Sequence, residues 1–340
     1  MSPMISYFLV SLFFITLEGY LKLNDLKCIQ IHNICLFSHM YDSLFSRSGL
    51  SLERMKNFLM VVESGSIAKA AGRDLNRQSL FSRQIRELEE FFRVELTSRK
   101  GKGIEITTAG HRLGVLIRSH LTSLEDFVVE ANAEPRIISI GGGGSAMSWI
   151  IDPVAGKLAD VMEGAALRLE TLKSMELIEK IRDGRLDFAV VRKSAVPKNL
   201  PALKIVEVGY VLCLPRSMLV KGMGVPEILR TCPLALPAGG SFKRILQDVF
   251  TSMDVPWKPA VESHSFVQAL SLVRTGQYVS ILPSTGALQL SKKDFVLKRV
   301  PQLNEYKREV VLHWNERQMT TRNIDQSQIR ALVKVLHVKS

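Results

Sequence analysis

Cysteine is scarce in this sequence, and its scarcity excludes two kinds of protein. The four cysteines (Cys28, Cys35, Cys213 and Cys232) are too few for a disulfide framework in 340 residues, and no two of them form a C-x-x-C pair. We therefore expect neither a disulfide-stapled secreted fold nor a structural zinc site, and a reducing cytoplasm fits the cysteine usage. The chain also lacks low-complexity tracts and clear internal repeats.

Motifs of catalysis are missing as well. The sequence has no G-x-x-x-x-G-K-[ST] phosphate loop, and Met147 stands where a G-x-S-x-G elbow would need its last glycine. His264 and His313 are isolated, and no spacing of histidines or acids indicates a metal. We expect no catalytic residue, no metal and no cofactor. One rival stays open, because Gly141-x-Gly143-x-x-Ala146, with Glu170 as a ribose acid, loosely fits a dinucleotide-binding enzyme.

Acidic residues are in deficit. Lysine and arginine total 45 against 33 aspartates and glutamates, so the net charge is +12 and the isoelectric point is about 9.6. This excess favours a polyanionic partner such as nucleic acid. Apolar residues make up 46% of the chain, which is ample for buried cores, and the length predicts two or three domains at about 150 residues each.

An almost wholly apolar stretch opens the chain, but it is short. Met4–Leu17 spans about 14 residues, whereas a membrane-spanning helix needs about 20. A secretory signal would carry basic residues before its apolar stretch, yet the first basic residue here is Lys22. We expect residues 1–39 to be an apolar extension outside the working protein, with Met40 as a natural internal start. A membrane anchor and a signal peptide are the alternatives.

A small helical module is expected next, between residues 50 and 106. Apolar residues at spacings of three and four begin at Leu52, and Ser66 is a suitable N-cap for a second helix. A short break at residues 74–76 separates the second helix from the third. The three expected helices are Leu52–Ser64, Ile67–Arg73 and Arg77–Phe92.

The third expected helix has two different faces. At about 100° per residue, one face gathers the large apolar side chains Leu80, Phe81, Ile85, Leu88, Phe91 and Phe92. The other face holds Gln78, Ser79, Ser82, Arg83 and Arg86, residue types that reach base edges and phosphates. No acid occurs from Leu75 to Arg86 to repel a phosphate. The pattern describes a helix-turn-helix, with an ordinary three-helix bundle as the alternative.

A basic glycine turn follows the helices. Arg99-Lys100-Gly101-Lys102-Gly103 lies between two short extended segments, Val94–Ser98 and Ile104–Thr107. By itself, such a turn is often only a solvent-exposed loop. Beside a reading helix, however, a basic hairpin can grip the flanking DNA backbone or enter the minor groove. The helix pair and the hairpin together indicate a winged helix-turn-helix.

The segment Phe58–Gly110 contains the motifs Gly65-Ser66, Ala70-Ala71, Ser82-Arg83-Gln84-Ile85, Leu88-Glu89, Arg99 and Ile106-Thr107-x-Ala109-Gly110. In these residues it resembles the winged helix-turn-helix of LysR-type transcriptional regulators. Two positions depart from the family's pattern: Arg77-Gln78 opens the third helix in place of Ser-Gln, and Asp74 replaces a leucine. The first departure affects the preferred operator bases, and the second affects how the turn packs.

Pattern and resemblance together predict which residues contact DNA. Gln78, Ser82 and Arg83 are expected to contact bases or adjacent phosphates, while Arg77 and Arg86 contact phosphates. The whole predicted set is Ser66, Arg77, Gln78, Ser79, Ser82, Arg83, Arg86, Arg99, Lys100 and Lys102.

A long linker helix is expected at residues 107–133. Thr107 or Thr108 can cap it, and its apolar residues step by four and three along Leu113, Ile117, Leu121, Leu124, Val128 and Ala131. This seam could belong to an ordinary core helix. The resemblance implies instead that the linker pairs chains into a homodimer or homotetramer, in which two reading heads bind one operator more tightly than one.

The remaining residues, 136–340, alternate short β-branched runs with helical segments. This order predicts α/β lobes with parallel strands and helices on both faces. The expected strands are Arg136–Ile140, Leu167–Glu170, Leu186–Val191, Lys204–Leu214, Leu234–Leu236, Val261 and Val279–Leu282. We expect lobe I at residues 136–194 and 301–340 and lobe II at 195–300, with a ligand between them.

Three serines stand where such a ligand would bind. Ser145, Ser174 and Ser241 each open a helix that follows a strand, where backbone N–H groups favour negative charge. Each serine could instead be a plain N-cap. This half resembles the LysR-type effector domain in the motifs Ser174-x-Glu176-Leu177, Asp183-Gly184-Arg185-Leu186-Asp187, Gly276 and Leu282-Pro283. The resemblance implies an effector site at the three serines, for a polar or anionic small molecule.

The sequence thus predicts a cytoplasmic LysR-type transcription regulator of mixed α/β fold. It would consist of an N-terminal winged helix-turn-helix, a linker helix and a two-lobed effector domain like that of periplasmic binding proteins. Its expected partners are double-stranded operator DNA, a small-molecule effector, further copies of itself and, as a candidate, RNA polymerase. A secreted or membrane-anchored solute-binding protein is the rival, although such a protein has no use for the acid-free face at residues 75–86.

Overall fold

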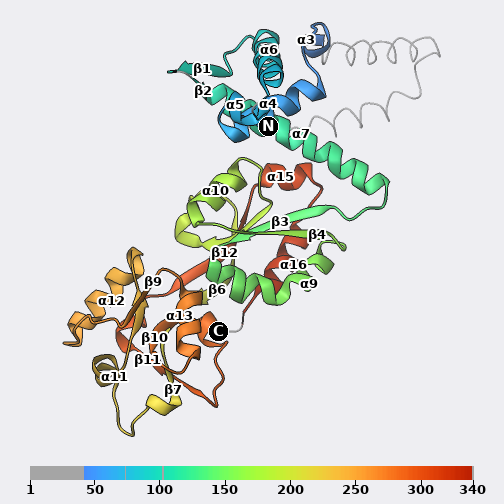
Figure 1. Ribbon diagram of the computed structural model, residues 1–340. Coiled ribbons are helices and arrows are strands. Elements are labelled where there is room, and N and C mark those ends of the chain that lie inside the picture. Colours follow the sequence, from blue (N-terminus) through green and yellow to red (C-terminus); the bar gives the residue numbers. More distant parts are fainter. Residues whose placement is uncertain (1–41, 73, 102, 339–340) are drawn as a thin grey trace, which may run out of the picture. The chain divides into compact units, whose positions relative to one another are not determined.

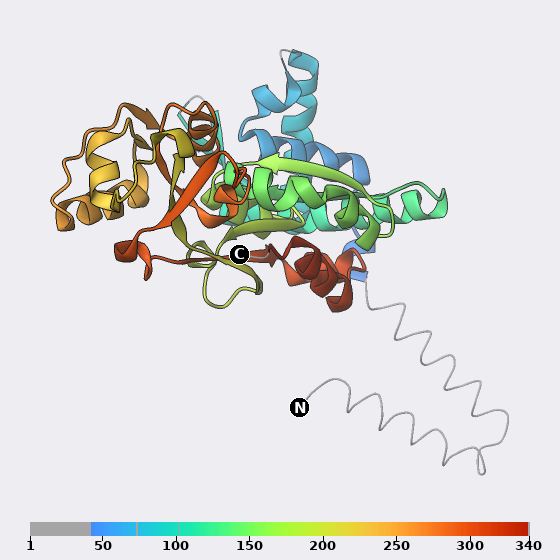
Figure 2. The same cartoon turned by 90° about the horizontal axis from the view of Figure 1, so that it is seen from below.

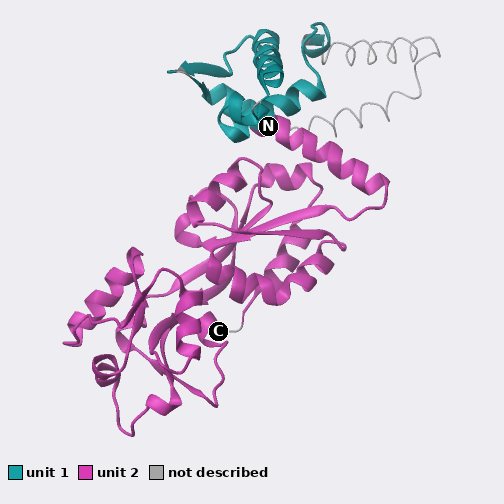
Figure 3. Ribbon diagram, in the orientation of Figure 1, with its two compact units in different colours: residues 1–114 teal, residues 115–340 magenta. Residues whose placement is uncertain are grey.

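The computed structural model describes residues 42–72, 74–101 and 103–338. The chain divides into two compact units, residues 1–114 and 115–340 (Figure 3). The division falls inside the linker helix α7 (Thr108–Ala131), so each unit contains a part of that helix. The expected apolar extension and Met40 lie outside the described residues. Within the described part, no helix is both long and apolar enough to cross a membrane.

The first unit is a helical module followed by a two-stranded hairpin (Figure 1). Its elements are α3 (Asp42–Phe45), α4 (Leu52–Ser64), α5 (Ile67–Ala71), α6 (Leu75–Phe92), β1 (Thr97–Lys100), β2 (Gly103–Ile106) and the start of α7. Gly65 ends α4 in the left-handed region (φ 67°), and Ser66 caps α5 as expected, accepting the Lys69 N–H. The core buries Phe58, Val61 and the apolar face of α6.

Helix α6 begins at Leu75, two residues before the expected start at Arg77. The cause is Asp74, whose carboxylate oxygen Oδ1 accepts hydrogen bonds from the backbone N–H groups of Asn76 (2.9 Å) and Arg77 (3.2 Å). A carboxylate at this position satisfies free donors and complements the positive end of the helix. The expected break at residues 74–76 is therefore wrong, and Asp74 acts as the N-cap.

The hairpin is tighter than expected. Its strands extend to Lys100 and Gly103, which pair directly, so the turn is shorter than the five residues expected from the sequence. Gly101 has φ 58°, the backbone conformation that short hairpin turns require. Glu89 fixes the hairpin to α6, because its carboxylate accepts hydrogen bonds from the backbone N–H groups of Leu96 and Thr97, both at 2.9 Å.

Lobe I of the second unit is built on a five-stranded sheet in the order β4-β3-β5-β12-β6. Its elements are β3 (Ile137–Gly142), α8 (Gly144–Ala146), α9 (Ala155–Val161), β4 (Ala166–Thr171), α10 (Ser174–Arg182), β5 (Phe188–Arg192), β6 (Ala202–Val208), β12 (Arg308–Trp314), α15 (Glu316–Thr321) and α16 (Gln326–Leu336). Strands β3, β4 and β5 are parallel as predicted, whereas β12 runs antiparallel to both its neighbours.

The sheet of lobe I is covered on both faces. Helices α9 and α16 lie on one side and α10 lies on the other (Figures 1 and 2). Along β5, Phe188 and Val190 pack in the core with α9 and α16, while Ala189 and Val191 pack in the core with α10. This two-sided burial explains why the strand is an unbroken apolar run.

Lobe II contains a three-stranded sheet, β10-β7-β11, and a two-stranded one, β8-β9, bridged at Leu234 and Val279. Its elements are β7 (Tyr210–Pro215), α11 (Val225–Thr231), β8 (Ala235–Pro237), α12 (Gly240–Ser252), β9 (Val261–Ser263), α13 (Phe266–Arg274), β10 (Ser280–Pro283), α14 (Ser284–Ala287) and β11 (Phe295–Arg299).

The expected boundary between the lobes, at residues 194 and 195, is wrong. The run Lys204–Leu214 is not one strand, because it divides at Gly209 into β6 and β7. Strand β6 pairs with β12 in lobe I, and β7 pairs with β10 and β11 in lobe II. The first crossover is therefore at Gly209. The second lies between β11 and β12, strands that the sequence reading missed.

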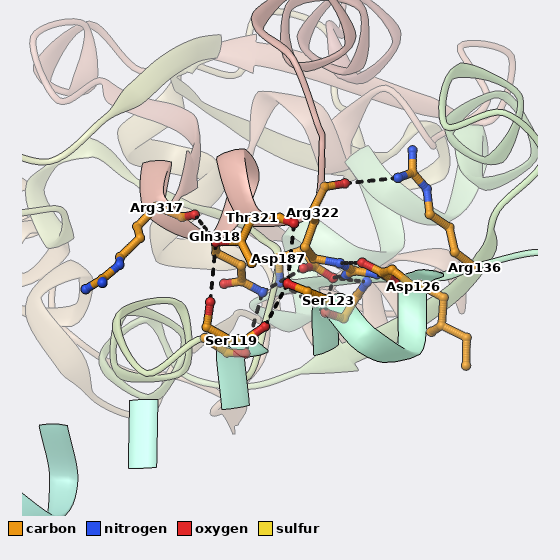
Figure 4. A network of polar contacts seen from close by, with 12 residues as sticks. Ser119, Ser123, Asp126, Arg136, Asp187, Arg317, Gln318, Thr321 and Arg322 are labelled. Carbon is orange, nitrogen blue, oxygen red and sulfur yellow. Dashed lines mark hydrogen bonds and ion pairs between the residues drawn. The ribbon is translucent and has the colours of Figure 1, made fainter. Parts of the chain in front are cut away.

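Arg322 joins the second part of α7 to lobe I (Figure 4). Its Nε and Nη2 donate to the two carboxylate oxygens of Asp126 on α7, both at 2.8 Å, and its Nη1 lies 2.7 Å from Asp187 Oδ2. Asp187 also accepts the backbone N–H of Ser139 at 2.8 Å. Burial opposes the charge on Arg322, but Asp126 and Asp187 outweigh it and raise the pKa of the guanidinium.

Candidate functional site

A groove of about 740 Å³ lies on the first unit between the start of α5, the N-terminal half of α6 and the hairpin. It brings together seven of the residues predicted to contact DNA: Ser66, Gln78, Ser79, Ser82, Arg83, Arg86 and Arg99. The other lining residues are Ile67, Ala68, Gly101, Gly103 and Ile104. Every charged residue of the lining is an arginine, so the groove favours an anion over its whole length.

The two faces of α6 are as predicted. Phe81, Ile85 and Leu88 are buried, whereas Arg83 and Arg86 are exposed at the groove. Gln78 and Ser82 are half-buried, and Gln78 Nε2 donates to the carbonyl oxygen of Gly72 at 3.4 Å. The polar side of the helix is therefore available to a partner and is not covered by neighbouring side chains.

The first acid of α6 lies just beyond the groove. Glu87 accepts a 2.6 Å hydrogen bond from Arg54 Nε on α4 and lies 3.6 Å from Arg83 Nε, whose side chain remains 71% exposed. One turn earlier, the buried Gln84 accepts a hydrogen bond from Asn57 Nδ2 at 2.8 Å. These contacts fix α6 on α4 while its arginines stay accessible.

Three predicted residues are not placed in the groove. Arg77 is exposed but does not line it, since its guanidinium carbon lies 5.6 Å from the ring centre of Phe81. Lys102 lies outside the described residues, and only the backbone of Lys100 is described.

A second pocket, of about 160 Å³, lies in the second unit between the two lobes. Ser145 and Ser174 line it together, as the resemblance implied, whereas Ser241 does not. The N-caps of α8, α10 and α12 are Gly143, Lys173 and Gly239, and no side chain caps these helices. The alternative reading of the three serines as plain N-caps is therefore wrong, and Ser145 and Ser174 line the pocket without forming a capping bond.

The sequence reading missed the charged and aromatic lining of this pocket. Arg192 ends β5, Arg308 begins β12, and Tyr210 begins β7. Burial raises the pKa of Tyr210 to about 12 even though Arg308 and Arg192 oppose the shift, so its phenol remains a hydrogen-bond donor. Arg192 had a detectable signal, a charge at the carboxyl end of a buried strand. Arg308 had none, because β12 was not recognised.

The glycine run before the pocket has a packing role. A Cβ atom on Gly141 would lie 2.4 Å from Leu177 Cδ2 and 2.9 Å from Leu186 Cδ2, so any other residue there would displace these two leucine side chains. Glu170, the candidate ribose acid, is paired with Lys180. Among the described residues, no group of three or more His, Cys, Asp or Glu is placed to hold a metal.

Family models match both parts of the chain. Residues 52–111 match the bacterial regulatory helix-turn-helix protein, lysR family, and residues 132–336 match the LysR substrate binding domain. The chain is 25% identical over 247 residues to the HTH-type transcriptional regulator TdcA of Escherichia coli K12, covering 70% of this chain and 79% of TdcA. It is 23% identical over 269 residues to the HTH-type transcriptional regulator BenM of Acinetobacter baylyi, covering 75% of this chain and 86% of BenM.

A solved structure shares the fold. A full-length OxyR variant from Pseudomonas aeruginosa superposes with a TM-score of 0.57 at 17% identity, covering 86% of this chain and 96% of that one. None of these matches supports the rival reading as a secreted solute-binding protein. With a LysR helix-turn-helix at residues 52–111 and a LysR substrate-binding domain at 132–336, the chain belongs to the LysR family of DNA-binding transcription regulators.

Proposed function

We propose that this regulator reads its operator with the N-terminal half of α6 in the major groove and the hairpin against the flanking backbone. The observation that carries the proposal is the groove of the first unit, whose charged lining residues are Arg83, Arg86 and Arg99 without an acid. Gln78, Ser82 and Arg83 contact bases or adjacent phosphates. The DNA backbone is contacted by Ser66, Arg77, Ser79 and Arg86 of the helices and by Arg99, Lys100 and Lys102 of the hairpin.

The second pocket binds the effector. Ser145 and Ser174 supply hydroxyl groups to a polar or anionic small molecule, and Ser241 is left out of this site because it does not line the pocket. Ligand binding changes regulation only if the ligand binds two arrangements of the chain with different affinity. The regulator works in the cytoplasm by binding and not by catalysis, as a homodimer or homotetramer, with RNA polymerase as a candidate partner.

The proposal is tested by substituting one arginine of the groove. Genomic footprinting supplies the operator duplex, and fluorescence anisotropy then measures the affinity of the full chain for it. Arg83→Ala is expected to weaken operator binding by about 1–3 kcal/mol, since a good arginine contact to a base is worth that much discrimination. Its effect on a scrambled duplex is expected to be smaller.

Arg112→Ala is the matched control, because Arg112 is an exposed arginine of the same unit outside the groove lining. Equal operator affinity for Arg83→Ala and Arg112→Ala would contradict the assignment of Arg83.

A further inference from the structure

The interlobe pocket contains two positive charges and no negative one. Its charged lining residues are Arg192 and Arg308, and the remaining lining side chains are neutral. Among the residues that the structure describes, no carboxylate forms an ion pair with either arginine. Glu207, an acid of the neighbouring strand β6, lies 2.9 Å from Lys307 Nζ and 3.6 Å from Lys204 Nζ. The protein thus leaves both guanidinium groups of the pocket without a counter-charge.

Strand pairing places the two arginines on one face of the sheet. Arg192 of β5 stands opposite Val310 of β12, and Arg308 lies two residues before Val310 on the same strand. Residues two apart on a strand point to the same face, and diagonal neighbours of this kind have Cα atoms about 7–8 Å apart. Two like charges at such a position repel each other, and an anion between them removes the repulsion.

Arg308 is also held by aromatic rings from lobe II. Its guanidinium carbon lies 5.4 Å from the ring centres of both Tyr210 and Phe242, and these two rings stack with centres 4.0 Å apart. Burial lowers the pKa of Arg308, which shows that part of its hydration is lost while the guanidinium remains charged. The side chain is therefore oriented by the protein before any ligand arrives.

Neutral donors and apolar side chains complete the lining. Thr285 is only 4% exposed, and no residue of the described chain forms a hydrogen bond with its hydroxyl, although it lines the pocket beside Ser145 and Ser174. The apolar part consists of Ala146, Ile150, Val208, Phe266 and Val310 with other buried side chains. An inorganic anion would leave these apolar groups against water, whereas a carbon framework would cover them.

We propose that the effector is a small organic dicarboxylate, whose two charges are matched by Arg192 and Arg308 and whose carbon chain lies against the apolar side chains. This inference rests on the proposed function of the pocket as the effector site. The volume of about 160 Å³ leaves room for a small acid.

Calorimetry on the full-length chain tests the proposal. The probes are malonate, succinate, glutarate and adipate, each compared with its monoamide and with the monocarboxylate of equal length. At least one dicarboxylate is expected to bind at least about 10-fold more tightly than its monoamide, because a hydrogen bond to a charged group contributes more than one to a neutral group.

Three variants connect the binding to the arginines. Arg192→Gln and Arg308→Gln are each expected to weaken dicarboxylate binding by about 10- to 100-fold, and Arg308→Lys, which keeps the charge, by less. Arg330→Gln, at an exposed arginine of α16 away from the pocket, is the control and is expected to change nothing. Circular dichroism confirms that each variant is folded.

Three results would overturn the inference: equally tight binding of the monoamides, no binding of any dicarboxylate, or unchanged affinity in Arg192→Gln. Operator binding by the same preparations separates this inference from the proposed function. If the chain binds its operator but no dicarboxylate, the proposed ligand class is refuted and the proposed DNA recognition stands. If the chain binds dicarboxylates but no DNA, the proposed DNA recognition is refuted and the ligand class stands.

Discussion

Arg322 illustrates how a single residue connects two elements of the second unit. Its side chain is 6% exposed and lies between Asp126 of α7 and Asp187, which is 2% exposed (Figure 4). The hydrogen bonds on both carboxylates offset the cost of removing three charges from water. One partner, Asp126, lies on the linker helix α7, and the other, Asp187, precedes β5. Arg322 therefore connects α7 directly to the sheet of lobe I.

Removing the Arg322 guanidinium should therefore destabilise the second unit strongly. Arg322→Met leaves two carboxylates without their partner, and loss of one member of a buried ion pair typically costs about 3–5 kcal/mol. Urea unfolding of the full chain measures the change in the free energy of unfolding. Arg330→Met, at an exposed arginine, is the control and should change it by less than about 0.5 kcal/mol. A loss below about 1 kcal/mol in Arg322→Met would show that Asp126 and Asp187 find other partners.

The positions of some site residues could be predicted from the sequence, and those of others could not. The polar face of α6 follows from helical periodicity alone, so Gln78, Ser82 and Arg83 were predictable. Ser145 and Ser174 followed from the resemblance, but Ser241 stands outside the pocket. The place of Arg308 in the pocket could not be predicted. It depends on the pairing of β12 with the distant strands β5 and β6, and a local sequence pattern does not indicate such pairing.

At the scale of elements, the linker helix α7 has an apolar face that its own unit leaves uncovered. The predicted seam divides into two parts: Ile117 is buried at 2% exposure, whereas Leu124 and Val128 are 49% and 54% exposed. Phe127, which the seam did not include, is 68% exposed. Apolar side chains clustered on one exposed helix face fit the proposal that this part of α7 contacts a second copy of the chain.

Charge on that face should separate the copies. Leu124→Glu combined with Val128→Glu places four carboxylates into the interface of a dimer, so sedimentation velocity is expected to show monomer where the unaltered chain shows dimer or tetramer. Operator affinity should fall as well, since one reading head replaces two. The control is Glu130→Gln, an exposed polar position on the same helix. A double variant that sediments like the unaltered chain would exclude this face as the interface.

Elements were predictable in type more often than in their limits. Strands β3, β4 and β5 occur within a few residues of their expected positions, and helices α10 and α12 begin within one residue of the expected starts at Ser174 and Ser241. Two boundaries failed for physical reasons: Asp74 caps α6 earlier than the break implied, and Gly209 divides an apparently continuous strand between two sheets. In both cases a single residue, and not the hydrophobic pattern, decides where the element begins or ends.

At the scale of the whole molecule, the net charge of +12 agrees with a protein that binds a polyanion, and the charged lining residues of the groove in the first unit are Arg83, Arg86 and Arg99. In the second unit, two further arginines, Arg192 and Arg308, line the pocket between the lobes. We therefore propose that one chain contains two sites for negative partners that differ in size: an open groove for a duplex and a small pocket for a metabolite-sized acid.

The most direct test of the account is photocrosslinking from defined positions of α6 to the operator duplex. A photoreactive amino acid is placed at Ser82, inside the groove, or at Glu90, an exposed position at the far end of the same helix. We expect efficient crosslinking to bases from position 82 and little from position 90. Equal crosslinking from both positions, or crosslinking from position 90 alone, would contradict the claim that the acid-free half of α6 reads DNA.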